Sequence, residues 1–184
     1  MIFRINEMMS LPFKHNEESV MRSFEIKQKL WSLAGKFDIN DEEGHLAYHV
    51  QGSFLKFLKE FTISDSQGQF VSHIKHHFSF PFQRFTVTFA DGKQITIQQR
   101  FSLFKAKYDI SDFGLEVAGD IWNMNFSLLD QEREVASIHQ EWFKIVSTYQ
   151  VDIYDDNLAD LVISLVIAID YVKAIESSSS SASS

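Results

Sequence analysis

Phe61-Thr62-Ile63-Ser64-Asp65 is one copy of the short pattern that decides the fold of this 184-residue chain. The pattern is an aromatic residue, any residue, an aliphatic residue, and an acidic residue two to four positions further on. It occurs six times, and its leading aromatics are 24, 24, 23, 18 and 23 residues apart. A repeat of this kind indicates that one supersecondary unit is used again and again. The six copies are residues 37–41, 61–65, 85–91, 108–112, 126–130 and 149–155.

Each copy predicts a β-hairpin. Its alternating apolar residues have the period of a strand with one buried face. The acidic residue then enters a turn, because Asp bonds to nearby backbone and Gly accepts positive φ. Glycines follow four of the copies, at Gly44, Gly68, Gly92 and Gly114. We expect second strands at 45–50, 69–74, 93–98 and 134–138, and a further strand at 23–30 that leads into the first copy.

Six hairpins supply about twelve antiparallel strands. An open sheet of that width would leave two exposed edges, and closure removes them. We therefore predict a closed twelve-stranded antiparallel barrel of six hairpins. Strands about 4.8 Å apart and tilted by roughly 40° would leave a bore of about 12 Å, which is close to the girth of one α-helix. An apolar helix is needed to fill it.

The C-terminal part of the chain supplies this helix. Residues 155–157, Asp-Asp-Asn, are helix N-capping types, and residues 161–169 are apolar on every side. Asp160 and Asp170 bracket a stretch much shorter than the roughly 20 residues of a membrane span. We predict that a helix at 157–176 occupies the barrel. The alternative is a short segment that inserts into lipid.

The chain is expected to form one domain. Residues 1–22 are predicted to be an N-terminal extension, residues 23–176 the barrel domain, and the Ser-rich residues 177–184 a disordered tail. There is no cysteine, which excludes disulfides and zinc–thiolate sites. Together with the lack of an apolar leader at the first residues, this favours a cytoplasmic protein. The oligomeric state is left open.

The net charge of −8 is divided unevenly along the chain. Residues 1–110 hold 14 Lys and Arg against 12 Asp and Glu, whereas residues 111–184 hold 3 against 13. So acidic a chain is not expected to bind nucleic acid. A local basic face on the first half remains compatible with these numbers.

Residues 27–33 and the hairpin from Phe37 to Gly44 are similar to the opening of the LURP-one-related proteins. Residues 117–122, Val-Ala-Gly-Asp-Ile-Trp, are similar to the part that leads into the fifth unit. The family's closing signature resembles residues 138–143 (Ile-His-Gln-Glu-Trp-Phe), 148–151 (Thr-Tyr-Gln-Val) and 166–170 (Val-Ile-Ala-Ile-Asp). The resemblance covers about residues 22 to 175.

This resemblance carries expectations about fold and function. The family belongs to the tubby C-terminal-like superfamily, which includes the phospholipid scramblases, and it implies a twelve-stranded barrel threaded by a hydrophobic helix. Tubby domains bind phosphoinositides, and scramblases are associated with lipid movement. We therefore expect a non-enzymatic, cofactor-free binding module at a membrane surface, which binds anionic phospholipid or is scramblase-like. The alternative is a protein-interaction or scaffold domain without lipid binding, and an enzyme of unrecognised type is the third interpretation.

The candidate lipid-binding residues are basic residues expected on outward strand faces. Lys27 and Lys29 alternate with apolar neighbours, and Lys75 follows Ile74. Aligned on neighbouring hairpins, such residues would form a patch for anionic headgroups, each charge contributing about 1 kcal/mol. The alternative is that they are ordinary solvated residues that protect strands. The set is Lys27, Lys29, Lys75, Arg100, Lys105 and Lys107.

Three clustered histidines are the candidate residues for a metal site, and we do not assign one to them. His73 and His77 share one strand face and His76 takes the other, so at most two of them can converge. The sequence also lacks a nucleophile elbow and a Gly-rich phosphate loop. We assign no catalytic residue, no metal and no cofactor.

Two further features are predicted to belong to the core. Phe78, Phe80, Phe82 and Phe85 surround Pro81, and they are expected to line the barrel across a bend rather than to form a membrane-inserting loop. Asp170 lies near the end of the buried helix and needs a partner or a route to solvent. The alternative is that it has already left the bore.

Overall fold

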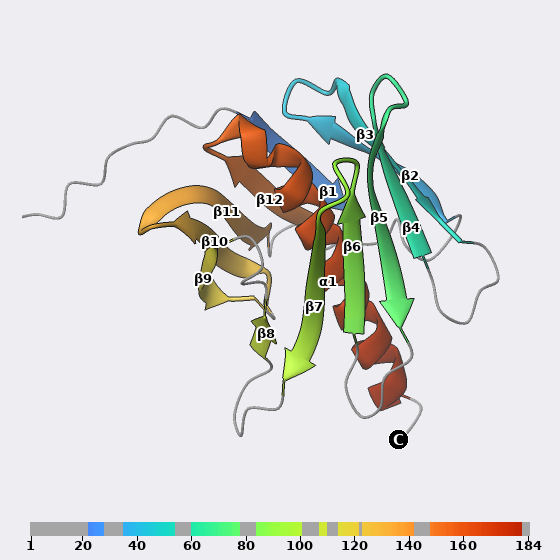
Figure 1. The fold of residues 1–184 in the computed structure, drawn as a ribbon, viewed down its shortest axis with the longest axis vertical. Coiled ribbons are helices and arrows are strands. Elements are labelled where there is room, and N and C mark those ends of the chain that lie inside the picture. Colours follow the sequence, from blue (N-terminus) through green and yellow to red (C-terminus); the bar gives the residue numbers. More distant parts are fainter. Residues whose placement is uncertain are drawn as a thin grey trace, which may run out of the picture.

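The structure is a computed structural model that describes residues 22–27, 35–53, 60–77, 84–100, 107–109, 114–121, 123–141 and 148–181. This part of the chain contains twelve strands and a long C-terminal helix (Figure 1). The strands are β1 (Arg22–Lys27), β2 (Lys36–Asp41), β3 (Leu46–Gly52), β4 (Glu60–Asp65), β5 (Phe70–His77), β6 (Arg84–Phe89), β7 (Gln94–Arg100), β8 (Lys107–Asp109), β9 (Glu116–Asp120), β10 (Asn125–Asp130), β11 (Arg133–Glu141) and β12 (Thr148–Ile153). A short 3₁₀ helix, η3 (Asp156–Leu158), leads into α1 (Ala159–Ser181).

The strands form one antiparallel sheet in the order β8-β7-β6-β5-β4-β3-β2-β1-β12-β11-β10-β9. The pairing of β1 with β12 joins the first strand to the last, with Arg22 opposite Ile153. These features confirm the predicted mainly β, antiparallel fold. Strands β8 and β9 stand at the two ends of the order, and no described residue pairs one with the other. The sheet is thus not closed by hydrogen bonds in the described residues, and the predicted closed barrel is not confirmed.

The six sequence copies fall on the even-numbered strands. In β4, Phe61 and Ile63 are buried while the residues between and beside them are more exposed. The same alternation holds for β2, β6, β10 and β12. The sixth copy differs from the prediction, because β12 is followed by η3 and α1 instead of a partner strand. The expected sixth hairpin is wrong for this reason, and β1 supplies the twelfth strand. The fourth hairpin is not confirmed either, because no described residue of β8 pairs with β9.

The turns have the chemistry that the repeat predicts. The Asp65 Oδ1 atom accepts the backbone N–H groups of Gln67 at 2.9 Å and Gln69 at 2.8 Å. Gly68 in the same turn has a φ of +79°, in the left-handed region that favours glycine. The acidic residue at Asp41 caps its turn in the same way. The acidic residue of the repeat therefore stabilises the turn through hydrogen bonds to the backbone.

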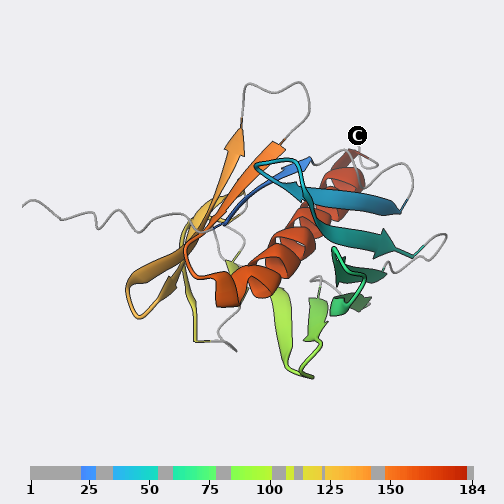
Figure 2. The same cartoon turned by 90° about the horizontal axis from the view of Figure 1, so that it is seen from above.

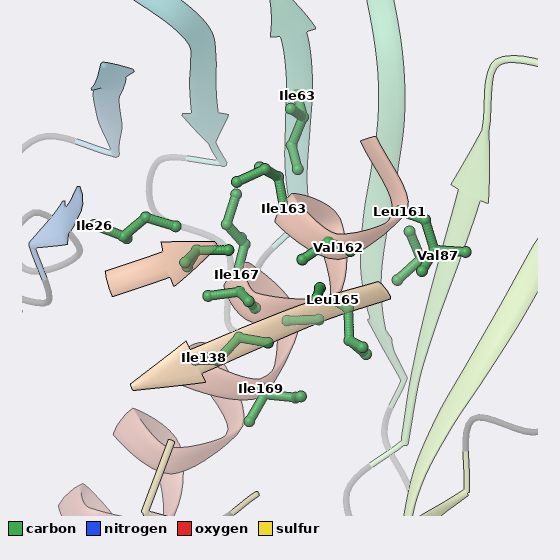
Figure 3. Packing of buried hydrophobic residues seen from close by; sticks show 14 of the residues in the cluster. Ile26, Ile63, Val87, Ile138, Leu161, Val162, Ile163, Leu165, Ile167 and Ile169 are labelled. Carbon is green, nitrogen blue, oxygen red and sulfur yellow. The ribbon is translucent and has the colours of Figure 1, made fainter. Parts of the chain in front are cut away.

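The apolar part of α1 lies inside the curved sheet. Every residue from 161 to 171 is buried, and Figure 2 shows strands on both sides of the helix. Figure 3 shows its apolar side chains among those of Ile26, Ile63, Val87 and Ile138, which come from four different strands. The predicted buried helix is confirmed, and the alternative of a lipid-inserting segment is wrong because the sheet covers the segment.

The helix is longer than predicted at its C-terminal end. It runs to Ser181, so residues 177–181 are helical where we expected the beginning of a disordered tail. Residues 182–184 and the extension up to residue 21 lie outside the described residues. Of the helices described, none combines the length and the apolar character needed to cross a membrane.

Candidate functional site

The sheet has two chemically different ends. Odd and even strands alternate throughout the order, and all neighbours are antiparallel, so every even strand runs in the same direction. Because the repeat places an acidic residue where an even strand finishes, the carboxylates collect at one end. We call this the acidic end, and α1 begins there. The opposite end, where the odd strands finish, is called the basic end.

The acidic end carries far more negative than positive charge. Its described cations are Arg22, Lys93 and Arg133. Each of these lies within 4.0 Å of a carboxylate in its own neighbourhood. The carboxylates at this end include Asp41, Glu42, Glu43, Asp65, Asp91, Asp130, Glu132, Glu134, Asp155, Asp156 and Asp160.

The basic end gathers four of the six predicted lipid-binding residues. Lys27 ends β1, Lys75 lies near the end of β5, Arg100 ends β7 and Lys107 begins β8. Figure 1 shows β5 and β7 finishing at the end where α1 also finishes. Lys29 and Lys105 lie outside the described residues.

The predicted residues do not form one continuous patch. Arg100 and Lys107 are direct cross-strand partners on β7 and β8. Lys75 lies on β5, and Lys27 is separated from it by β2, β3 and β4. Lys27 is moreover close to its neighbour Glu25, with 3.5 Å between Nζ and Oε1. The basic end is therefore a rim with cations at intervals.

Two further cations of this rim were not among the predicted residues. Arg84 begins β6 opposite His77, and Lys36 begins β2. Burial, and then the nearby positive charges of Arg84 and Lys75, lower the pKa of His77. The signal that would have found Arg84 is its place just before the third sequence copy, because the start of an even strand always lies at this end.

The histidines divide between the faces as predicted. His73 and His77 are half-buried on the outer face, and His76 is buried. The His76 ring stacks on Phe85, with 4.5 Å between ring centres, and meets the edge of Tyr171. Within the part of the chain that the structure describes, no group of three or more His, Cys, Asp or Glu side chains is arranged to hold a metal ion.

Phe85 is fully buried, as predicted for a core residue. Phe78, Phe80 and Phe82 lie outside the described residues. Among the described residues, the exposed large hydrophobic side chain is Phe70 on β5, at 46%. Of the four phenylalanines, Phe85 is therefore the one whose place in the core is confirmed.

Asp170 has a partner inside the fold. It is fully buried, and its Oδ1 atom accepts a hydrogen bond of 2.6 Å from the Tyr149 hydroxyl on β12. The alternative that Asp170 has left the bore is wrong. Lys173 extends this cluster, with its Nζ 5.6 Å from the centre of the Tyr149 ring. Burial lowers the pKa of Lys173, while Asp170 and Asp120 oppose the shift.

The free energy of unfolding is expected to fall as the pH rises above about 10. Burial, and then the neighbouring carboxylates Asp160 and Asp170, raise the pKa of Tyr48 and Tyr149 above the ordinary value. The stabilising contribution of the two neutral tyrosines is fully present below the pKa that they have in the unfolded chain. It is lost as the pH rises towards their higher pKa in the folded protein. Each can contribute at most about 1.4 kcal/mol per pH unit in that window.

Urea unfolding at a series of pH values tests this expectation. Tyr149→Phe should make the alkaline decline shallower, because only one of the two shifted phenols is left. Tyr154→Phe is the control, since Tyr154 is half-buried and its hydroxyl bonds to Ser137 rather than to a carboxylate. An unchanged slope in Tyr149→Phe would contradict the assignment.

Comparison with known proteins identifies the fold and the family. A solved X-ray structure of a protein from Arabidopsis thaliana has the same fold, with a TM-score of 0.54, 18% identity, and coverage of 82% of this chain and 90% of that one. The uncharacterised protein YxjI of Bacillus subtilis (strain 168) is 26% identical over 145 residues, which are 78% of this chain and 88% of YxjI. The family model described as LURP-one-related matches residues 22–170, from the first strand to the buried aspartate of α1. The chain therefore belongs to the LURP-one-related family.

Proposed function

We propose that this chain is a non-enzymatic binding module that attaches to anionic phospholipid through its basic end. The observation that carries the proposal is the charge polarity of the sheet. Lys27, Lys75, Arg84, Arg100 and Lys107 lie at the end opposite to the acidic turns. An anionic surface would attract the basic end and repel the acidic one, so binding would orient the protein.

The packing of α1 supports a surface-binding role. Residues 161–171 are buried, and they fill the space in which a carrier protein would hold a small molecule. A ligand is therefore expected to approach from outside the sheet. Each Lys or Arg near an anionic membrane contributes about 1 kcal/mol, so the cations of the basic end, with Lys36 among them, can together support reversible attachment. Such attachment is screened by salt.

Family resemblance adds support from a different direction. The tubby-like and scramblase-like relatives suggested by the sequence act at membranes. The basic rim accounts for peripheral binding to a cytoplasmic membrane surface, and it does not require lipid to be moved. We therefore propose lipid binding as the activity. We do not extend the proposal to lipid scrambling, because no contact of the described residues favours it.

Vesicle co-sedimentation of the full chain tests the proposal. The protein is expected to sediment with vesicles of phosphatidylserine in phosphatidylcholine at low salt, and not with phosphatidylcholine alone. The double variant Lys75→Glu with Arg84→Glu should weaken partitioning by at least about tenfold, because it removes two cations of about 1 kcal/mol each. Both side chains are exposed, so the fold is expected to tolerate the change.

The matched control is Lys93→Glu, which makes the same charge change on an exposed lysine of the acidic end. It should leave vesicle binding nearly unchanged. Absence of sedimentation at low salt would refute lipid binding. An equal loss in Lys93→Glu would refute the assignment to the basic end.

A further inference from the structure

A pocket with a volume of about 270 Å³ opens at the acidic end. Ala47 and Val71, which are buried, and Leu46, which is half-buried, supply its apolar lining. The polar lining is Arg22, Asp41, Tyr48, Asp65, Ser66 and Asp160. The residues come from β1, from the β2–β3 and β4–β5 hairpins and from the first turn of α1, so only the folded sheet assembles them.

The carboxylates of this pocket are held in place by the fold. Asp41 and Asp65 each accept two backbone N–H groups of their own turns through Oδ1. The Asp160 Oδ1 atom accepts a hydrogen bond of 2.9 Å from the hydroxyl of Tyr48. These three carboxylates line the same pocket. Because hydrogen bonds fix their positions, they need little reorganisation to bind a cation.

Arg22 shows how this region accommodates a guanidinium group. Its charged head lies 4.9 Å from the centre of the Phe24 ring and 5.9 Å from that of Tyr48, at distances typical of cation–π contact. Its NH1 atom is 3.2 Å from Oδ1 of Asp156, which is not part of the lining. Asp156 therefore offsets the charge of Arg22, and the pocket keeps the charge of its three carboxylates.

We propose that this pocket docks a lysine or arginine side chain of a basic segment in a protein partner. A pocket of this volume has room for a long cationic side chain, whose head would meet the carboxylates while its stem passes the half-buried Leu46. Outside the pocket, the turn residues Glu42 and Glu43 extend the negative surface. A segment with several cations uses this extension, whereas a single free amine would not.

The surroundings favour a protein over a membrane as the occupant. An anionic bilayer is repelled by this end of the molecule. Phe70 begins β5 directly before the lining residue Val71 and is 46% exposed, so an apolar side chain is available to a partner at this end of the sheet. The pocket lies at the end opposite to the basic rim, so the inference is independent of the lipid proposal. If both are correct, the module connects a membrane surface to a basic protein.

Fluorescence anisotropy with a labelled Arg-Gly-Arg-Gly-Arg peptide tests the proposal on the full chain at low salt, with a Glu-Gly-Glu-Gly-Glu peptide as the probe control. The double variant Asp65→Asn with Asp160→Asn is expected to weaken binding of the Arg peptide by about tenfold. Asparagine keeps the size of the side chain and an oxygen that can accept the same hydrogen bonds, so the turn and the contact with Tyr48 can persist.

The matched control is Asp91→Asn. Asp91 occupies the corresponding turn between β6 and β7, where its Oδ1 atom accepts the backbone N–H of Lys93 at 2.9 Å, and it does not line the pocket. Binding should change by less than about threefold in this variant. Thermal unfolding of each variant verifies that it is folded. For the unmodified chain, amide NMR signals of residues 41–47 and 65–71 should shift on adding the Arg peptide.

Three results would overturn the inference. The first is no binding of the Arg peptide together with no shift of those amide signals. The second is an equal loss in Asp91→Asn, because it would mean that the acidic end attracts cations without using the pocket. The third is that free agmatine binds as tightly as the peptide, because the occupant would then be a small cation rather than a protein segment. Vesicle binding has no influence on any of these outcomes.

Discussion

Replacement of Phe85 by alanine is expected to lower the free energy of unfolding by about 3–5 kcal/mol. The Phe85 side chain on β6 is fully buried. Its ring lies between the sheet and the helix, stacked on His76 at 4.5 Å and meeting Tyr171 of α1 edge-on at 5.6 Å. Its removal leaves a cavity on both sides of this contact, and neither the sheet nor the helix can close it without moving.

Urea unfolding followed by tryptophan fluorescence measures the effect. The matched control is Phe70→Ala on the neighbouring strand β5, whose side chain is 46% exposed. This variant is expected to lose less than about 1 kcal/mol. Comparable losses in the two variants would show that α1 does not depend on the Phe85 contact.

The second large effect is expected at Gly119 on β9. This residue has a φ of +112°, and a Cβ built on it would lie 2.7 Å from the backbone oxygen of Asn125 and 2.9 Å from Cα of Phe126. Both atoms belong to the backbone of the neighbouring strand β10, so they cannot rotate away as a side chain would. Gly119→Ala should therefore cost about 3 kcal/mol or more, from backbone strain and the clash together.

Gly68→Ala separates these two causes. Gly68 has a φ of +79°, but a Cβ there would meet nothing within 4 Å. Only the conformational cost of about 1–2 kcal/mol is expected. The two midpoints of urea unfolding should differ clearly, and a Gly119→Ala protein as stable as Gly68→Ala would mean that β9 is not held against β10 as described.

The strands and the helix could be predicted from the sequence because their signals are local. The alternation of Phe61 and Ile63 with polar residues sets the buried face of a strand, whatever pairs with it. An apolar run without a polar face, such as residues 161–169, has to be enclosed. The turn aspartates act on backbone two and four residues away, so they too can be recognised within a short window.

The missed features depend on contacts between distant segments. Nothing near Arg22 indicates that β1 pairs with β12, because its cross-strand partner is Ile153. The same holds for the pocket, where Tyr48 and Asp160 are 112 residues apart in sequence. The basic rim was predicted as a strand face, with Lys27 beside Lys29, whereas the fold groups cations by strand end. Strand direction, rather than side-chain alternation, decides which of them are neighbours.

The buried position of α1 affects when the sheet can complete its core during synthesis. A ribosome completes every strand of the sheet before it releases the helix, which ends only at Ser181. Until then, the inward side chains of the nascent sheet have nothing to cover them, and β1 has to wait for β12 as well. The core of this domain is thus expected to close only after α1 has been synthesised, and the unfinished domain is a natural client for chaperones that shield apolar surface.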